Sequence, residues 1–256
     1  MIQPVAHGSA AEQLGRLFLA AVLVVFLPQL PLGNYIVYPF TILTTWFHEM
    51  GHGLTGLLLG NGFERLVIFP DGSGFAETVY PGRAGGLSRA LVAAGGPLGP
   101  VIIGAALILA SSRTQWWKPA LLALAAIIAL SALIWVRSAT GLIVLPAIAA
   151  AFGWLALRAP AWAQRFALQF TGVMAAMSML RDWDYMFSCR AEIGGRMMTS
   201  DTCAMQDALI LPYWLWALLI IAVSAVIIGA TLKYALAQQQ RASTVPWPRP
   251  WPPRRG

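Results

Sequence analysis

Long apolar runs separated by short polar segments occupy most of the chain. Several of them are about twenty residues long, which is the length that a helix needs to cross the hydrocarbon core of a bilayer. The pattern therefore predicts an all-α polytopic membrane protein with about seven transmembrane helices. The expected spans are residues 14–32, 35–59, 87–110, 118–135, 140–157, 166–187 and 213–236.

The stretch after the second apolar run does not fit a membrane helix. Residues 62–80 hold two short apolar segments on either side of Pro70-Asp71-Gly72-Ser73-Gly74, a composition typical of a turn between strands. We expect a small β-hairpin at the membrane surface. Its unpaired edge could accept an extended peptide, with Phe69 and Gly74 in contact with that peptide. A hairpin that merely caps the helices is an equally good interpretation.

The third apolar run contains Gly95-Gly96-Pro97-Leu98-Gly99-Pro100. Two prolines so close together should break or kink the helix, and a bilayer tolerates this only where the backbone is buried in protein or lines a cavity. We infer a cavity there and place Gly96 and Pro97 among the residues that contact a substrate. A kink that serves packing alone is the alternative.

The composition agrees with a membrane protein, because 58% of the residues are hydrophobic and only 11% are charged. We expect one transmembrane domain over residues 1–237 and a disordered tail rich in Pro, Arg and Trp over residues 238–256. The net charge of +7 is scattered over loops and tail. It favours contact with the lipid bilayer and gives no basis for nucleic-acid binding. The expected location is a bacterial inner or plasma membrane, as an integral multi-pass protein.

The orientation in the membrane is weakly determined by charge, since Lys and Arg are almost evenly divided between the two sides. The basic tail favours a cytoplasmic C-terminus. Cys189 and Cys203 lie in one polar loop and could form a disulfide if that loop faces an oxidising compartment. The sequence gives no oligomeric state.

The most specific chemical signal is His48-Glu49-Met50-Gly51-His52, inside the second apolar run. Positions four apart lie on one face of a helix, so His48 and His52 can bind one metal ion. Glu49, on the adjacent flank, can then act on a water molecule at that ion. This is the arrangement of a metal-dependent hydrolase.

Candidates for a third metal ligand occur where the sixth apolar run ends in Arg181-Asp182-Trp183-Asp184. Ionisable groups at such a position are costly unless they are paired, hydrated or bound to metal. Asp182 and Asp184 cannot share one helical face, because positions two apart point about 200° away from each other. Either carboxylate could instead pair with Arg181.

Taken together, these features resemble the site-2 protease type of intramembrane zinc metallopeptidases, in the compact branch that lacks a PDZ domain. The resemblance rests on His48 to His52 in a membrane helix, the hairpin after it, Gly96-Pro97-Leu98-Gly99 in the third run, and the acidic helix end at Arg181 to Asp184. It extends from Tyr35 to Leu211.

The resemblance implies one zinc ion per chain, bound by His48, His52 and a carboxylate from a later helix, with Glu49 as the general base. The family's Asn-Pro…Leu-Asp-Gly segment is absent, and Pro100 stands where an Asn often follows Gly-Pro. For the third ligand we favour Asp184, followed by Asp182 and then Asp201.

The expected function is an intramembrane zinc endopeptidase that cleaves membrane-protein substrates. Two alternatives are a catalytically silent relative that binds membrane partners and a transporter of metal or small solutes. Glu49 favours the peptidase, because neither alternative needs a carboxylate between the two histidines. The sequence does not name the substrate.

Overall fold

The computed structural model describes residues 10–82 and 85–244. Seven helices of at least seventeen residues make up most of this part. They are α1 (Ala10–Phe26), α2 (Gly33–Leu58), α3 (Gly86–Ser111), α4 (Thr114–Ile134), α5 (Ala139–Arg158), α6 (Ala161–Arg181) and α9 (Tyr213–Thr244). Each overlaps one of the seven predicted apolar spans, but α1 ends before residue 32, α6 ends before residue 187 and α9 extends past residue 236.

Five segments of the described chain are long and apolar enough to cross a membrane. They are Ala11–Gln29, Gly86–Ser111, Thr114–Ile134, Ala139–Arg158 and Tyr213–Gln238. The helices α2 and α6 are not among them, so a count of seven transmembrane helices is not confirmed. Both helices carry buried polar side chains, such as Glu49 in α2 and Gln169 in α6, which lower their mean hydropathy. The five apolar helices identify the chain as an integral, multi-pass membrane protein.

A short 3-10 helix, η1 (Leu27–Gln29), joins α1 to α2, and the described residues also form two antiparallel hairpins. The first pairs β1 (Gly62–Ile68) with β2 (Gly74–Val79), in the stretch for which the sequence predicts a hairpin. The second pairs β3 (Arg190–Ile193) with β4 (Arg196–Thr199) and was not predicted. Two short helices flank it, α7 (Trp183–Met186) and α8 (Asp201–Ala208).

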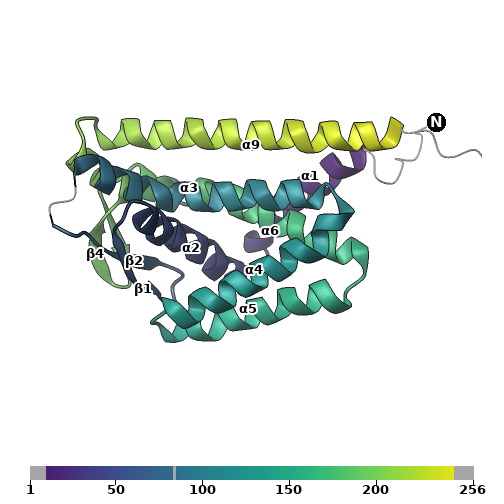
Figure 1. The fold of residues 1–256 in the computed structure, drawn as a ribbon, viewed down its shortest axis with the longest axis horizontal. Coiled ribbons are helices and arrows are strands. Elements are labelled where there is room, and N and C mark those ends of the chain that lie inside the picture. Colours follow the sequence, from purple (N-terminus) through teal and green to yellow (C-terminus); the bar gives the residue numbers. More distant parts are fainter. Residues whose placement is uncertain (1–9, 83–84, 245–256) are drawn as a thin grey trace, which may run out of the picture.

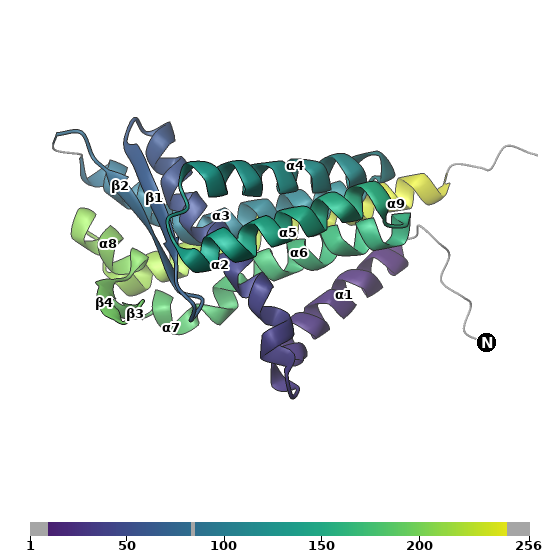
Figure 2. The ribbon, with the colours of Figure 1, turned by 90° about the horizontal axis from the view of Figure 1, so that it is seen from below.

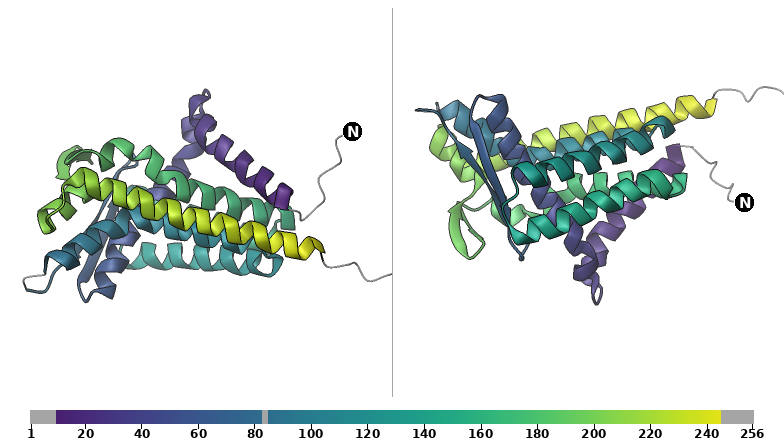
Figure 3. Two further views of the ribbon diagram at one scale, coloured as in Figure 1. Left: turned by 90° about the horizontal axis from the view of Figure 1, so that it is seen from above. Right: turned by 60° about the horizontal axis from the view of Figure 1, so that its bottom comes forward.

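The hairpins and the two short helices gather at one end of the helix bundle (Figures 1 and 2). We call this the hairpin end, and we call the opposite end, where α1 begins and α9 finishes, the terminal end. α9 runs along one face of the bundle beside α3, while α4 and α5 form the opposite face (Figures 1 and 3). α1 and the first turns of α2 project from the bundle (Figures 2 and 3).

α3 is one continuous helix, although it contains Pro97 and Pro100. Of the break or kink that the sequence predicts there, the structure excludes the break. The glycines of this segment instead allow α2 and α3 to approach closely. A Cβ atom at Gly51 would lie 2.1 Å from the carbonyl oxygen of Gly95, and one at Gly99 would lie 2.8 Å from the carbonyl oxygen of Phe47.

The disordered tail was expected to begin at residue 238, but α9 continues to Thr244. Here Gln238 accepts a hydrogen bond at 2.6 Å from the guanidinium of Arg113, in the loop between α3 and α4. The helix therefore extends past the expected domain boundary. The remainder of the expected tail, residues 245–256, lies outside the described residues.

Candidate active site

The two histidines of α2 lie on one face of the helix, as their spacing predicts. Their ring centroids are 4.9 Å apart, and both side chains are mostly buried. The helix continues without interruption through the motif to Leu58. Both Nε2 atoms can therefore serve as ligands on the same side of α2.

The carboxylate that meets these imidazoles belongs to Asp201. Its Oδ2 atom lies 3.0 Å from Nε2 of His48, and its Oδ1 atom lies 3.2 Å from Nε2 of His52. The preceding residue, Ser200, caps α8 by accepting a hydrogen bond at 3.3 Å from the N–H of Cys203. Because Ser200 provides the cap, the Asp201 side chain remains available to the histidines.

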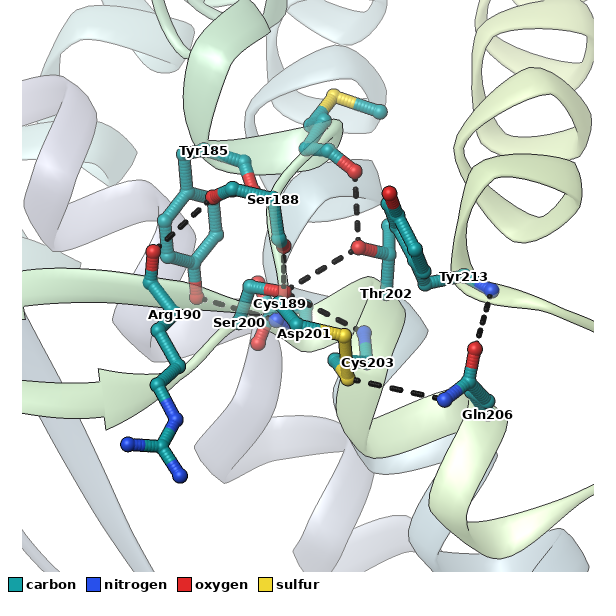
Figure 4. Close-up of a disulfide and its surroundings, with 11 residues drawn as sticks. Tyr185, Ser188, Cys189, Arg190, Ser200, Asp201, Thr202, Cys203, Gln206 and Tyr213 are labelled. Carbon is teal, nitrogen blue, oxygen red and sulfur yellow. Dashed lines mark hydrogen bonds between the residues drawn. A yellow bond between two sulfur atoms is a disulfide. The ribbon is translucent and has the colours of Figure 1, made fainter.

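Asp201 is held in place by a disulfide-closed loop (Figure 4). Cys189, just before β3, is bonded to Cys203 in the first turn of α8. The hydroxyl of Thr202 also donates a hydrogen bond at 2.8 Å to the carbonyl oxygen of Met186 in α7. The disulfide thus ties the beginning of α8 to the residue before β3, and the Thr202 hydrogen bond ties it to α7.

His48, His52 and Asp201 form a set of residues that fits a zinc ion. Each offers one ligand atom, and the three ligand atoms lie within 4.8 Å of one another. Two imidazole nitrogens and one carboxylate are a common donor set of catalytic zinc sites, which keep a fourth position open. Burial alone would raise the pKa of Asp201, but the neighbouring imidazoles lower it below its usual range. The carboxylate is thus ionised, as a metal ligand must be.

Two contacts from α3 orient the histidines. Nδ1 of His52 donates a hydrogen bond at 2.7 Å to the carbonyl oxygen of Val92, which leaves Nε2 free to bind metal. Gly96 packs directly against both rings, since a Cβ atom there would lie 2.2 Å from Nε2 of His52 and 2.7 Å from Nε2 of His48. A side chain at position 96 would therefore displace the ligands.

Glu49 lies between two cavities of about 350 and 420 Å³. The first extends along α2 towards the end of α6, and the second extends between β2, α3 and α8. Four of the described residues line both cavities: Glu49, Gly74, Tyr185 and Ile193. The Glu49 side chain is buried, with 6% of the residue exposed. The two cavities therefore meet at the carboxylate that the sequence assigns as the base.

The strand that faces this junction is β2. On the far side of β1, the N–H of Leu66 donates to the carbonyl oxygen of Trp135 at 2.8 Å, and the carbonyl oxygen of Leu66 accepts from the N–H of Arg137 at 2.9 Å. Leu66 is the register partner of Ala76. Because both backbone groups of Leu66 point away from β2, those of Ala76 point away from β1, towards the free edge. Ala76 lines the second cavity together with Glu49.

The β3–β4 hairpin approaches the same junction from the other side. The N–H of Gly194, at its tip, donates a hydrogen bond at 3.0 Å to the hydroxyl of Ser73 in the β1–β2 turn. A Cβ atom at Gly194 would also lie 2.3 Å from the ring of Phe69. The tips of the two hairpins are thus in contact above the junction.

The structure separates the residues that the sequence proposed for the site. Among the described residues it groups His48 and His52 with Asp201, the third of our three candidates. Asp182 and Asp184 are exposed, because α6 ends at Arg181 and their side chains remain at the surface. Asp182 lines only the first cavity, and Asp184 lines neither.

The residues expected to contact a substrate are similarly divided. Gly74 lines both cavities, whereas Gly96 packs on the imidazoles and Pro97 is buried within α3. Phe69 packs under the β3–β4 tip and against Phe75. Sequence reasoning missed Tyr185 and Ile193, for which the sequence carries no motif. For Asp201, the third-ranked candidate, the signal that could have raised its rank is its place between Cys189 and Cys203, directly after a capping serine.

Comparison with family models finds a match to the Peptidase M50B-like family over residues 17–231. Comparison with curated proteins and with solved structures finds no match. The matched region includes every residue of the candidate site. It confirms the resemblance to the site-2 protease type, and the chain belongs to the peptidase M50B-like family.

Proposed function

We propose that the protein is an intramembrane zinc endopeptidase with Glu49 as its general base and His48, His52 and Asp201 as its zinc ligands. The observation that carries this proposal is the position of Glu49. Its buried carboxylate lies next to a three-residue donor set and at the junction of two cavities. Membership of a metallopeptidase family supports the same activity.

A zinc ion at these donors would supply Lewis-acid polarisation of the scissile carbonyl and a water molecule of lowered pKa. Glu49 takes one proton from the attacking water as its oxygen bonds to the carbonyl carbon. When the carbon–nitrogen bond breaks, Glu49 returns that proton to the leaving amine. The products are one new carboxyl group and one new amino group.

The substrate would bind as an extended strand along β2. A helical peptide hides its carbonyl groups in its own hydrogen bonds, so the segment to be cleaved has to unwind. The free edge of β2 at Ala76 offers backbone groups to such a strand beside Glu49. The substrate class is therefore a membrane-protein segment that can be locally extended, within a bacterial plasma membrane.

The test compares the purified wild type with Glu49→Gln on single-span membrane substrates whose helices contain Gly or Pro. We expect Glu49→Gln to retain one zinc per chain and to lose cleavage, because glutamine cannot accept the proton. Glu64→Gln is the matched control, since Glu64 is exposed on β1 and lines neither cavity. Full cleavage by Glu49→Gln would contradict the mechanism. A wild type that binds zinc but cleaves nothing would indicate a silent relative.

A further inference from the structure

Tyr185 is the described residue at the cavity junction whose role the mechanism above leaves open. Of the four residues that line both cavities, Glu49 is the base, and Gly74 and Ile193 carry no polar side chain. Tyr185 is therefore the member of this group whose side chain can donate a hydrogen bond at the place where the reacting bond must lie.

The hydroxyl of Tyr185 is fixed next to the proposed ligands. Its oxygen accepts a hydrogen bond at 3.2 Å from the backbone N–H of Asp201 (Figure 4). Its ring meets the His48 ring edge to face at a centroid distance of 6.3 Å. The tyrosine lies in α7, which Thr202 ties to α8. Since the oxygen already accepts from Asp201, the hydroxyl proton is the group left to donate.

The Asp201 carboxylate lies within reach of that proton. It already has other partners, however, because Oδ2 faces His48 and Oδ1 faces His52. A bound metal ion would be shared by the same three residues. The carboxylate is therefore already stabilised without the tyrosine. A carbonyl oxygen that gains negative charge in a buried site has no such partner, and unpaired buried charge is costly.

We propose that Tyr185 is a catalytic residue that donates a hydrogen bond to the oxygen of the scissile carbonyl. This inference rests on the proposed peptidase function. As the water oxygen bonds to the carbonyl carbon, the electron pair of the carbonyl moves onto its oxygen, and the Tyr185 hydroxyl stabilises that charge. Tyr185 keeps its proton throughout, and proton transfer remains with Glu49. The donor matters only as the charge develops, so it acts on turnover more than on substrate binding.

The experiment is Tyr185→Phe, which removes the hydroxyl and keeps the ring against His48. We expect kcat to fall on the order of 100-fold with little change in KM, as for loss of an oxyanion donor. Zinc affinity, measured by competition with a chromophoric chelator, should equal that of the wild type. Tyr213→Phe is the control, because Tyr213 lines neither cavity.

A second measurement does not depend on turnover. An alkyl hydroxamate presents an anionic oxygen to a zinc site, so its affinity for zinc-loaded protein should fall at least about tenfold in Tyr185→Phe, through loss of one charge-assisted hydrogen bond. Loss of zinc affinity in this variant would instead assign Tyr185 to positioning Asp201. Unchanged kcat and unchanged hydroxamate affinity would also overturn the inference. If the wild type cleaves no substrate, the peptidase function fails, while the hydroxamate comparison still tests Tyr185.

Discussion

The Oδ2 atom of Asp201 lies 3.0 Å from Nε2 of His48, although 153 positions separate the two residues in the chain. This contact joins the first turn of α8 to the middle of α2. It exists because two separate devices, the Ser200 cap and the Cys189–Cys203 disulfide, fix the start of α8. The proposed metal site is therefore completed by the polar loop that precedes α9, and not by the acidic end of α6.

The first prediction concerns this third ligand. Asp201→Ala should weaken zinc binding by at least about 100-fold, beyond the roughly 10- to 100-fold cost of losing an outer partner of a ligand. Asp184→Ala is the matched control, because Asp184 is exposed and lies outside both cavities. Zinc titration of both purified variants checks the ranking. If Asp184→Ala lost more zinc affinity than Asp201→Ala, the third ligand would be Asp184 in α7.

A comparison of α2 with α8 shows which parts of the site could be predicted from the sequence. Apolar periodicity and helix spacing are local properties, so they predicted the extent of α2 and the shared face of His48 and His52. The position of Asp201 depends on a loop closed by a disulfide and on contacts between α7 and α8. No local pattern encodes such contacts, and for this reason Asp184, beside a long apolar run, was the more attractive candidate.

The same distinction explains the two features that sequence reasoning missed or misjudged. Tyr185 lies at the cavity junction because hydrogen bonds from Asp201 and Thr202 tie α7 to α8, which nothing around Tyr185 signals. Pro97 and Pro100 suggested a broken or kinked helix by a local rule, but α3 is continuous and its glycines lie in close contact with α2. Tertiary contacts outweighed the local preference in that case.

The second prediction concerns Gly96. Gly96→Ala should lower zinc affinity and destabilise the fold by about 1–3 kcal/mol, because the added methyl group overlaps both imidazoles. Gly153→Ala in α5 is the control, since a Cβ atom there meets nothing within 4 Å. Gly153→Ala should stabilise the protein by roughly 0.4–1 kcal/mol, because alanine lowers the conformational entropy of the unfolded chain. Thermal unfolding and zinc titration would measure both effects, and equal behaviour of the two variants would contradict the close packing.

The third prediction concerns the free edge of β2. Ala76→Pro removes the N–H that points away from β1, while the ladder with Leu66 loses no hydrogen bond. We expect cleavage to fall far more in Ala76→Pro than in Ala76→Gly, which keeps the donor. Both variants should retain zinc. If proline and glycine reduce cleavage equally, the substrate does not pair with this edge.

The fourth prediction concerns the disulfide. Cys189 and Cys203 are 14 positions apart, and opening a loop of about this size costs roughly 3 kcal/mol in the chain-entropy account. The double variant Cys189→Ser/Cys203→Ser should bind zinc on the order of tenfold more weakly, as when an outer partner of a ligand is lost. Reductant should weaken zinc binding by the wild type to the same level and leave the double variant unchanged. If reduction left the zinc affinity of the wild type unchanged, the disulfide would not be needed to position Asp201.

The last prediction concerns orientation in the membrane, for which two independent features agree. Disulfides persist in oxidising compartments, and Cys189–Cys203 joins the residue before β3 to α8 at the hairpin end. α9 runs from the hairpin end to the terminal end, and the sequence after it carries Arg249, Arg254 and Arg255. Because basic segments are retained in the cytoplasm, this tail places the terminal end there. The candidate site then opens towards the outside of the cytoplasm.

Labelling of intact cells with a membrane-impermeant maleimide tests this orientation with a matched pair of exposed positions. Arg196→Cys lies on β4 at the hairpin end, and Arg113→Cys lies in the loop between α3 and α4 at the terminal end. We expect the reagent to label Arg196→Cys in intact cells and to label Arg113→Cys only after the cells are opened. The reverse result would place Cys189 and Cys203 in the cytoplasm, where thiols are kept reduced. The functional protein would then contain the two cysteines as free thiols.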